Sequence, residues 1–288
     1  MNTIQSPVQS PVSMPETMRA LKPLMSGVGW WTIGLALAVM AGYAAVFSAV
    51  ALGILPLLAG AGINVVLGYL IFTPLHDASH GSIAGRRQGL KWLERSIGYA
   101  AGSLLWAPLP AFQLLHLRHH SHTNDPNEDP DHWVATRNPL LLMLRSFTIM
   151  FSYYYQFLAR PDAQKRKKLP ALILNVAVML AVVAAMGWRF GPMFPIVLWF
   201  LPSVCSLAIL AIVFDWLPHQ PHASRERYLD TRVILVPGLQ TLLLGQNLHL
   251  VHHLYPTVPF YKYGKAFRIV RPLLESKGSP IYEFGARS

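Results

Sequence analysis

The chain has 288 residues, of which 53% are hydrophobic and only 13% are charged, and its formal net charge is +11. A soluble domain is normally about a quarter charged, so the composition indicates an integral membrane protein. The single cysteine, Cys205, excludes a disulfide framework and a cysteine-ligated zinc or iron–sulfur site. Because no nucleic-acid motif accompanies the basic residues, we expect no nucleic-acid partner and attribute the charge to contact with a lipid membrane.

The first predicted element is a polar tail. Residues 1–25 are rich in Pro and Ser, and they lack the apolar core of a signal peptide. We therefore expect a disordered cytoplasmic tail over 1–25, followed by one membrane domain over 26–288.

Four membrane-spanning helices follow from the apolar runs. No residue from Pro23 to Leu75 is charged, and this stretch is too long for one span and suited to two, which Pro56 separates. Two further apolar runs occur in the second half of the chain. The predicted spans are 28–52, 57–76, 171–188 and 192–216.

Two shorter apolar stretches are not predicted to span. Residues 96–110 are few and end near two prolines, and residues 139–158 carry Arg145 and three tyrosines. We expect both stretches to lie at the membrane interface or against the protein.

The basic residues orient the predicted spans. Of the 24 Lys and Arg residues, only Arg189 falls between paired helices. By the positive-inside rule, both termini and the segment between the two helix pairs face the cytoplasm. The predicted fold is an all-α integral membrane protein of the inner or plasma membrane, with four transmembrane helices arranged as two hairpins beneath a cytoplasmic histidine-rich cap that binds two metal ions.

Eight of the 12 histidines form three clusters, in the segments "HDASH", "HLRHH" and "HLVHH". Residues at positions i, i+3 and i+4 share one face of a helix, so each cluster can point its imidazoles at a common centre. Neutral imidazole is the commonest metal ligand in proteins, and eight imidazoles exceed the needs of one ion. We therefore predict two metal ions held by His76, His80, His116, His119, His120, His249, His252 and His253.

The remaining histidines are assigned individually. His219, in "FDWLPHQPH", is predicted to be a ninth ligand, whereas His122, His132 and His222 are expected to be ordinary polar residues. The clusters contain no Glu-x-x-His pattern, which argues against a carboxylate-bridged di-iron bundle. Imidazole alone does not select iron over copper or zinc.

Acidic residues near the clusters are candidate partners of the imidazoles. A ligating imidazole usually donates its second N–H to a carboxylate or carbonyl oxygen. The alternative for each acid is a solvated turn, because Asn-Asp-Pro is a strong turn signal. The candidates are Asp77, Asp125, Asp129, Asp131 and Asp215.

The three histidine boxes, HxxxH, HxxHH and a late HxxHH, resemble those of the membrane fatty acid desaturase and hydroxylase superfamily, over roughly residues 70–265. The wording "HDASHGS", "FDWLPHQP" and "GQNLHLVHHLYPTVPFYKY" is most similar to that of desaturase-like β-carotene hydroxylases. The resemblance implies two non-haem irons, dioxygen as co-substrate, and nine ligands. His222 stands where the family is expected to have an apolar or aromatic residue, so it remains an alternative to His219. The nine implied ligands are His76, His80, His116, His119, His120, His219, His249, His252 and His253.

Three functions remain open. The first, slightly favoured, is a di-iron hydroxylase acting on a β-carotene-like ring. The second is the same machinery acting on a fatty acid, as a desaturase, a hydroxylase or a terminal-alkene-forming decarboxylase. The third is a membrane metal-binding or transport protein, against which no line of histidines or charges crosses the spans.

The partners follow from the chemistry. A lipophilic substrate is expected to enter from the bilayer. The residues of "WAPLPAF" (106–112) and the run Tyr153–Tyr155 are either its path or, as favoured here, an interfacial aromatic belt. The sequence lacks a haem or flavin motif, so we expect an external electron donor, which would be a ferredoxin, a rubredoxin or a cytochrome with its reductase. The basic run "KRKK" (165–168) is a candidate docking site for an acidic donor.

Overall fold

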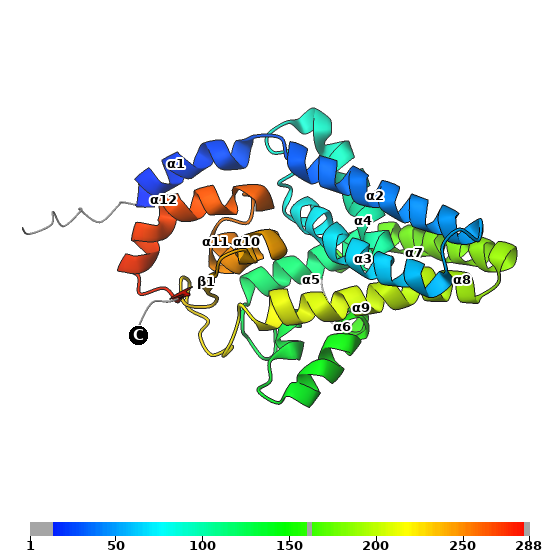
Figure 1. Ribbon diagram of the computed structural model, residues 1–288. Coiled ribbons are helices and arrows are strands. Elements are labelled where there is room, and N and C mark those ends of the chain that lie inside the picture. The colour runs from blue at the N-terminus through cyan, green and yellow to red at the C-terminus, as the bar shows by residue number, and fades with distance from the viewer. Residues whose placement is uncertain (1–13, 160–162, 285–288) are drawn as a thin grey trace, which may run out of the picture.

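The structure is a computed structural model that describes residues 14–159 and 163–284, and these residues are mostly helical (Figure 1). The first half of the predicted disordered tail, residues 1–13, lies outside the described residues. From Met14 onward the chain departs from that prediction, because Met14–Ser26 forms helix α1.

Four helical segments are long and apolar enough to cross a membrane, as predicted: Glu16–Ala51, Leu57–His80, Gln164–Phe190 and Met193–Trp216. The first contains α1 and α2 (Trp30–Ala51), the second is α3 (Leu57–His80), and the third belongs to α7 (Ala163–Phe190). The fourth runs through α8 (Met193–Pro195), the π-helix η3 (Ile196–Phe200), α9 (Leu201–Leu210) and the π-helix η4 (Ala211–Trp216).

The second span is longer than predicted. Helix α3 continues one turn past His76 to His80, and Gly81 ends it with a φ of 72°, a value that glycine adopts without strain. The Thr32 hydroxyl donates to Asp77 Oδ2 at 2.7 Å. This bond satisfies a buried carboxylate that hydropathy alone would exclude from a membrane-spanning helix.

Small and polar residues hold the spans together. Helix α2 packs on α3, and α3 packs on α9. The Asn64 side chain donates to the carbonyl of Leu198 at 2.7 Å, and the Ser206 hydroxyl donates to the carbonyl of Val65 at 2.8 Å. Gly60 lets the helices approach closely, because a Cβ there would lie 2.9 Å from Leu198 Cδ2.

The two apolar stretches that were not predicted to span pack on this bundle. Residues 96–110 divide between α4 (Lys91–Leu104), which lies on α3, and the start of α5 (Leu109–Ser121), which contacts α3 and α7. The second stretch is α6 (Pro139–Ala159), which packs against α9. The short η1 (Gln88–Leu90) precedes α4, and η2 (Pro130–Val134) precedes α6.

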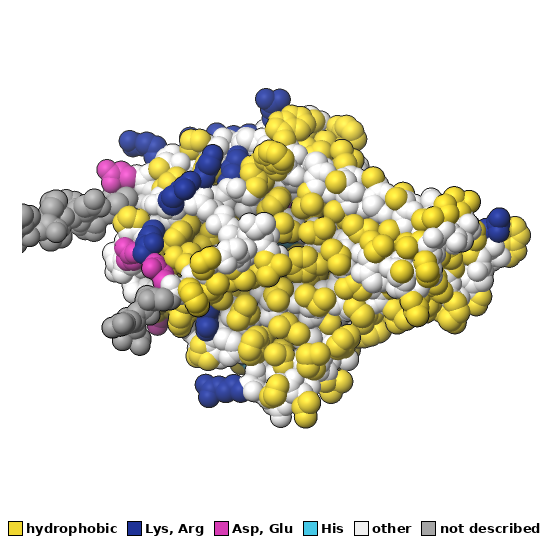
Figure 2. Space-filling model, in the orientation of Figure 1, with side chains coloured by type: hydrophobic (Ala, Val, Ile, Leu, Met, Phe, Trp, Pro, Cys, Tyr) yellow, Lys and Arg dark blue, Asp and Glu magenta, His cyan; other side chains and the backbone are white. Residues whose placement is uncertain are grey.

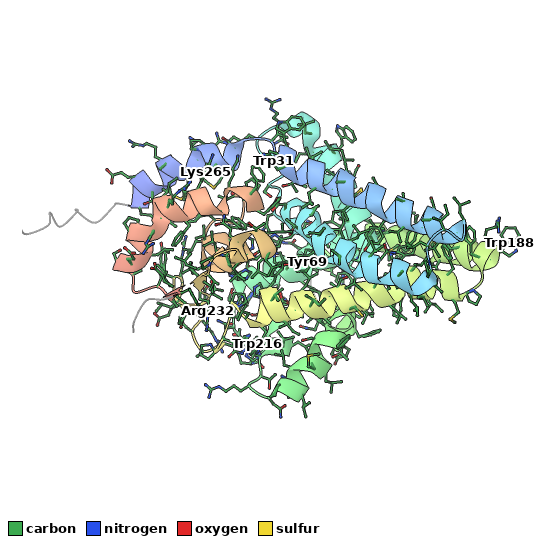
Figure 3. The ribbon with its side chains drawn as sticks, viewed as in Figure 1. Trp31, Tyr69, Trp188, Trp216, Arg232 and Lys265 are labelled. Carbon is green, nitrogen blue, oxygen red and sulfur yellow. The ribbon has the colours of Figure 1, made fainter. Side chains whose placement is uncertain are left out.

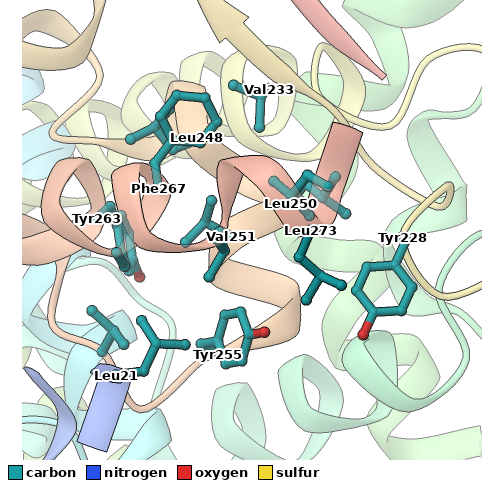
Figure 4. Close-up of a cluster of buried hydrophobic side chains, with 14 residues drawn as sticks. Leu21, Tyr228, Val233, Leu248, Leu250, Val251, Tyr255, Tyr263, Phe267 and Leu273 are labelled. Atoms are coloured by element: carbon teal, nitrogen blue, oxygen red, sulfur yellow. The ribbon is translucent and has the colours of Figure 1, made fainter. Parts of the chain in front are cut away.

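The C-terminal part forms a separate layer beyond the ends of the spans (Figure 1). It comprises β1 (Val233–Leu235), α10 (Leu239–Leu242), η5 (Gln246–Leu248), α11 (His249–Leu254), η6 (Phe260–Lys262), α12 (Tyr263–Ser276) and β2 (Ile281–Glu283), and β1 pairs with β2 in parallel. Figure 4 shows its core, in which Leu21 of α1 meets residues such as Tyr263 and Val251. The face of α1 that carries Leu21 is buried against the C-terminal layer, and this burial explains why α1 is a helix.

The surface separates by residue type. Hydrophobic side chains cover the region of the spans, and most Lys and Arg side chains lie at the end where α1 and α12 are found (Figure 2). Trp188 lies at the opposite tip of the molecule (Figure 3) and is 88% exposed.

Candidate metal centre

Nine histidines from four segments converge where the spans meet the C-terminal layer. They lie at the end of α3, on α5, just after η4, and on α11. They form two groups, and in each group the nitrogens available for a metal all lie within 4.8 Å of one another. The five-histidine group is His76, His80, His116, His120 and His252, and the four-histidine group is His119, His219, His249 and His253.

The two HxxHH clusters divide between the groups, which differs from the expectation that each cluster serves one centre. Helix α5 gives His116 and His120 to the five-histidine group and His119 to the other. Helix α11 gives His252 to the former and its two other histidines to the latter. Successive residues of a helix are about 100° apart, so positions i and i+4 point in directions that differ by about 40°, whereas i+3 points about 100° away from i+4. In each cluster the histidines at i and i+4 therefore share one group, and the histidine at i+3 belongs to the other.

The Nε2 atoms point at common centres. The distance between the Nε2 atoms of His80 and His116 is 2.8 Å, and that between His76 and His252 is 3.0 Å. In the four-histidine group, the His253 Nε2 lies 3.1 Å from that of His249 and 3.2 Å from that of His119.

The donor set fits transition-metal ions. Both ring nitrogens of His219 are buried and have no hydrogen-bond partner among the described residues, and a buried polar atom without a partner is costly unless another ligand satisfies it. Converging imidazole nitrogens suit iron, copper or zinc, whereas magnesium and calcium take oxygen ligands.

Electrostatics favour the neutral form that binds metal. Burial, followed by the charge of neighbouring imidazoles, lowers the pKa values of His116, His252 and His253 well below the usual range. The same two causes lower the pKa values of His219 and His249. A neutral imidazole presents a lone pair to a cation, so these side chains are ready to coordinate at neutral pH.

His119 is an exception because it faces carboxylates. Burial acts to lower the pKa of His119, but Asp129 and Asp131 outweigh it and raise the pKa to about 10. The His119 Nδ1 lies 2.8 Å from Asp129 Oδ1 and 3.4 Å from Asp131 Oδ2. Burial raises the pKa of Asp131 itself to about 6, and its other oxygen accepts a hydrogen bond from the Tyr153 hydroxyl.

Three of the acids chosen from the sequence do not contact an imidazole directly. Asp77 Oδ1 lies 3.9 Å from His76 Nδ1, which is too far for a hydrogen bond. Asp125 instead accepts from Arg225 at 2.7 Å and from backbone amides of its own turn, as the turn alternative anticipated. Asp215 lines the cavity described below and, among the described residues, makes no hydrogen bond to a histidine.

Two neutral residues make contacts with imidazoles of the two groups, and the sequence analysis did not find either of them. The Tyr263 hydroxyl lies 2.8 Å from His252 Nδ1, and Gln246 Oε1 lies 3.1 Å from His249 Nδ1. Gln246 precedes His249 by one helical turn, and both Gln246 and Tyr263 belong to the segment "GQNLHLVHHLYPTVPFYKY", so the signal was present although neither residue was given a role. The search for carboxylates alone passed over both.

The other histidines stand apart from the groups. His219 lies in the four-histidine group and His222 does not. His122 contacts the carbonyl of Arg118, and the ring of His132 lies 6.0 Å from that of His222.

An apolar cavity that opens to the outside reaches both groups. At the metal end it is lined by histidines of both groups, and elsewhere mainly by apolar side chains of α3, α5, α6 and α9. Trp106, Tyr153 and Tyr154 are part of its wall, so they line a cavity where an interfacial belt was favoured from the sequence. The cavity extends from Leu207 to Asp215 along the fourth span, a rise of about 12 Å.

The fold and the site together define a class: a membrane protein in which two sets of buried imidazoles border a cavity for an apolar ligand. The model of the family "Fatty acid desaturase" matches residues 48–285. The chain therefore belongs to the fatty acid desaturase family, and it is an oxidoreductase of the membrane desaturase and hydroxylase superfamily.

Individual relatives are distant. A beta-carotene ketolase from Paracoccus sp. is 25% identical over 197 residues, which cover 67% of this chain and 71% of the ketolase. An sn-1 oleoyl-lipid 12-desaturase from Anabaena variabilis is 22% identical over 289 residues, covering 88% of this chain and 75% of the desaturase. An sn-1 acyl-lipid omega-3 desaturase (ferredoxin) from Synechocystis sp. is 21% identical, covering 74% of this chain and 66% of the relative.

Proposed function

We propose that the chain is a dioxygen-dependent di-iron oxidase that attacks an unactivated C–H bond of a lipophilic substrate. The observation that carries the proposal is the apolar cavity that ends at both imidazole groups. Two iron ions held by the nine histidines would supply dioxygen activation and the oxidising power for removing hydrogen.

The side chains of this chain have three roles in that reaction. The imidazoles hold the metal ions, and Asp129, Gln246 and Tyr263 fix the ring orientation of three of them. Apolar residues such as Phe72 and Phe214 exclude water and present the carbon that reacts.

A carotenoid ring is the substrate that we favour. The relative named beta-carotene ketolase supports this choice, and the aromatic side chains that line the cavity, Phe72 and Phe112 among them, suit a flat conjugated group. The second candidate is a fatty acyl chain, because the similarity to a lipid desaturase extends over 88% of this chain.

We infer that the first and second spans form one hairpin, that the third and fourth form another, and that the metal centre faces the cytoplasm. Helix α2 has 22 residues, which rise about 33 Å and suffice for the hydrocarbon core. Exposed Trp31 and Trp188 lie at its two boundaries (Figure 3), where tryptophan is enriched. The Lys and Arg residues seen at the end that holds the site support a cytoplasmic position for that end by the positive-inside rule.

Metal transport is the rival function. The metal groups lie at one end of the spans, and the cavity that leads away from them is apolar, so the described residues provide no polar path for an ion.

Product analysis tests the proposal. Membranes containing the protein, an electron donor and dioxygen are supplied with β-carotene or with medium-chain fatty acids, and products are identified by mass spectrometry. We expect an oxygenated or desaturated product whose formation stops without dioxygen. His116→Ala should lose iron from the five-histidine group and should also lose turnover. Full turnover of this variant would contradict the assignment.

A further inference from the structure

A surface groove lies between α12, α10 and β1 of the C-terminal layer. Gly264 lets α12 and the Gln240 side chain approach closely at this groove, because a Cβ at position 264 would lie 2.7 Å from Gln240 Nε2. The groove is lined by Leu235, Gln240, Leu248, Tyr261, Gly264, Lys265, Phe267 and Arg268.

Positive charge follows one edge of this groove. Lys262, Lys265 and Arg268 succeed one another at single-turn spacing on or beside α12, and the last two are exposed. Neither Lys265 nor Arg268 forms an ion pair with any described residue, whereas Arg271, one turn further, pairs with Glu275 and Glu283. Like charges at this spacing destabilise a helix, so an acidic partner would relieve a cost already present in the fold.

The lining of the groove is joined to the metal centre through neighbouring residues of the chain. Leu248 lines the groove, is 1% exposed and directly precedes His249 of the four-histidine group. Tyr263, which directly precedes Gly264 of the groove, is fully buried, and its hydroxyl lies 2.8 Å from Nδ1 of His252 in the five-histidine group. A partner seated in the groove would therefore contact residues that adjoin both groups.

We propose that this groove and its basic edge form the docking site of the electron donor, a small acidic iron–sulfur or haem protein. The proposal rests on the proposed function, which consumes two electrons per turnover from outside the chain. At each encounter the donor is oxidised by one electron, which passes beneath Leu248 and Tyr263 to the metal centre.

Two other placements are less well supported. In the "KRKK" run, Lys165 donates to the carbonyl of Leu158 and Lys168 to Gln113 Oε1, both at 2.6 Å, so these two ammonium groups are held by neutral acceptors of the chain. Lys262 is likewise held by the carbonyl of Leu24 at 3.0 Å, so Lys265 and Arg268 are the cations that the groove presents to a partner. A lipid surface would need the charges at one depth, but α12 runs alongside α1 and away from the spans, with Lys265 near its start (Figures 1 and 3).

Charge reversal tests the site by binding. The full chain in phosphatidylcholine nanodiscs is titrated by surface plasmon resonance with a [2Fe–2S] ferredoxin, a rubredoxin and a cytochrome, and the tightest binder is retained. We expect Lys265→Glu/Arg268→Glu to raise the Kd at least about tenfold and to flatten its salt dependence. The neutral pair Lys265→Gln/Arg268→Gln should give a smaller rise of the same sign.

The matched control is Arg166→Glu/Lys167→Glu, which reverses two exposed charges of the "KRKK" run and should leave the Kd unchanged. Turnover driven by dithionite should be the same in all variants. Absent dithionite-driven turnover in the wild type would refute the proposed function instead. The docking proposal is overturned by an unchanged Kd in the α12 variants, by an equal loss in the control, or by an effect seen only in nanodiscs containing phosphatidylserine, which would assign the charges to lipid.

Discussion

His119 differs from the other eight histidines because its second nitrogen faces a carboxylate. Asp129 accepts a hydrogen bond from Nδ1–H at 2.8 Å, which orients the ring, and a metal ion at Nε2 would displace the proton that the raised pKa favours there. The Asp129 backbone belongs to the acidic turn that follows α5, and its Oδ2 also accepts the amide of Asn124 at 2.7 Å. The turn therefore orients a carboxylate that in turn orients an imidazole.

We expect Asp129→Asn to lower the affinity of the four-histidine group for iron about 10- to 100-fold, because the amide keeps the size but loses the charge that supports the imidazole. Competition with a coloured chelator measures the affinity. Asp125→Asn is the control, since Asp125 contacts Arg225 and its own turn. Equal affinities in the two variants would argue against a role for the Asp129 contact.

Tyr263 has the corresponding place beside the five-histidine group. With His252 Nε2 turned to the metal, Nδ1–H donates to the Tyr263 hydroxyl oxygen, and Phe at this position leaves that N–H without a partner at a cost of about 1–3 kcal/mol. We expect Tyr263→Phe to weaken iron binding by this group about 10-fold or more. Tyr255→Phe is a matched control, because the Tyr255 hydroxyl is buried and has no hydrogen-bond partner in the described part of the chain. Iron titrations that do not distinguish the two variants would contradict the prediction.

At the scale of elements, close contact between spans depends on glycine. A Cβ at Gly60 would lie 2.8 Å from Val50 and 2.9 Å from Leu198, whereas a Cβ at Gly62, two residues along the same helix, has no neighbour within 4 Å. We expect Gly60→Val to destabilise the fold by about 1–3 kcal/mol through overpacking and Gly62→Val to have little effect. Thermal unfolding in detergent measures both, and equal melting temperatures would show that the helices can separate without cost.

The spans were predictable because a long uncharged run has few other interpretations in water or lipid. The ends of the helices were less so. Helix α3 continues through polar residues because Thr32, 45 positions earlier, bonds to Asp77. Helix α1 forms because Leu21 is buried against the C-terminal layer. Both depend on contacts between distant parts of the chain, which local composition does not encode.

The division of ligands between the two groups also required the fold. Helical spacing brought the histidines of each cluster together, but the partner helices decide which of them share a centre. Tyr263 and Gln246 escaped the sequence analysis because a neutral oxygen satisfies an imidazole N–H as well as a carboxylate does, and Tyr and Gln are common elsewhere in the chain.

At the scale of the whole molecule, four apolar spans and one C-terminal layer enclose a site that neither could build alone. The spans supply the histidines of α3 and lead into His219 after η4, α5 on the bundle supplies three more, and the layer supplies those of α11. The apolar cavity lies between the second and fourth spans and the helices α5 and α6 that pack on them, and the groove with its basic edge belongs to the layer. A lipophilic substrate and a water-soluble donor thus have separate routes to one centre.

The iron content of the purified chain tests the central claim most directly. Protein is produced with added iron and analysed by inductively coupled plasma mass spectrometry, together with His80→Ala/His120→Ala and His219→Ala/His249→Ala, each of which removes two ligands from one group. The account predicts two irons per chain in the wild type and one in each variant. A wild type with one iron or none, or a variant that keeps both, would contradict it.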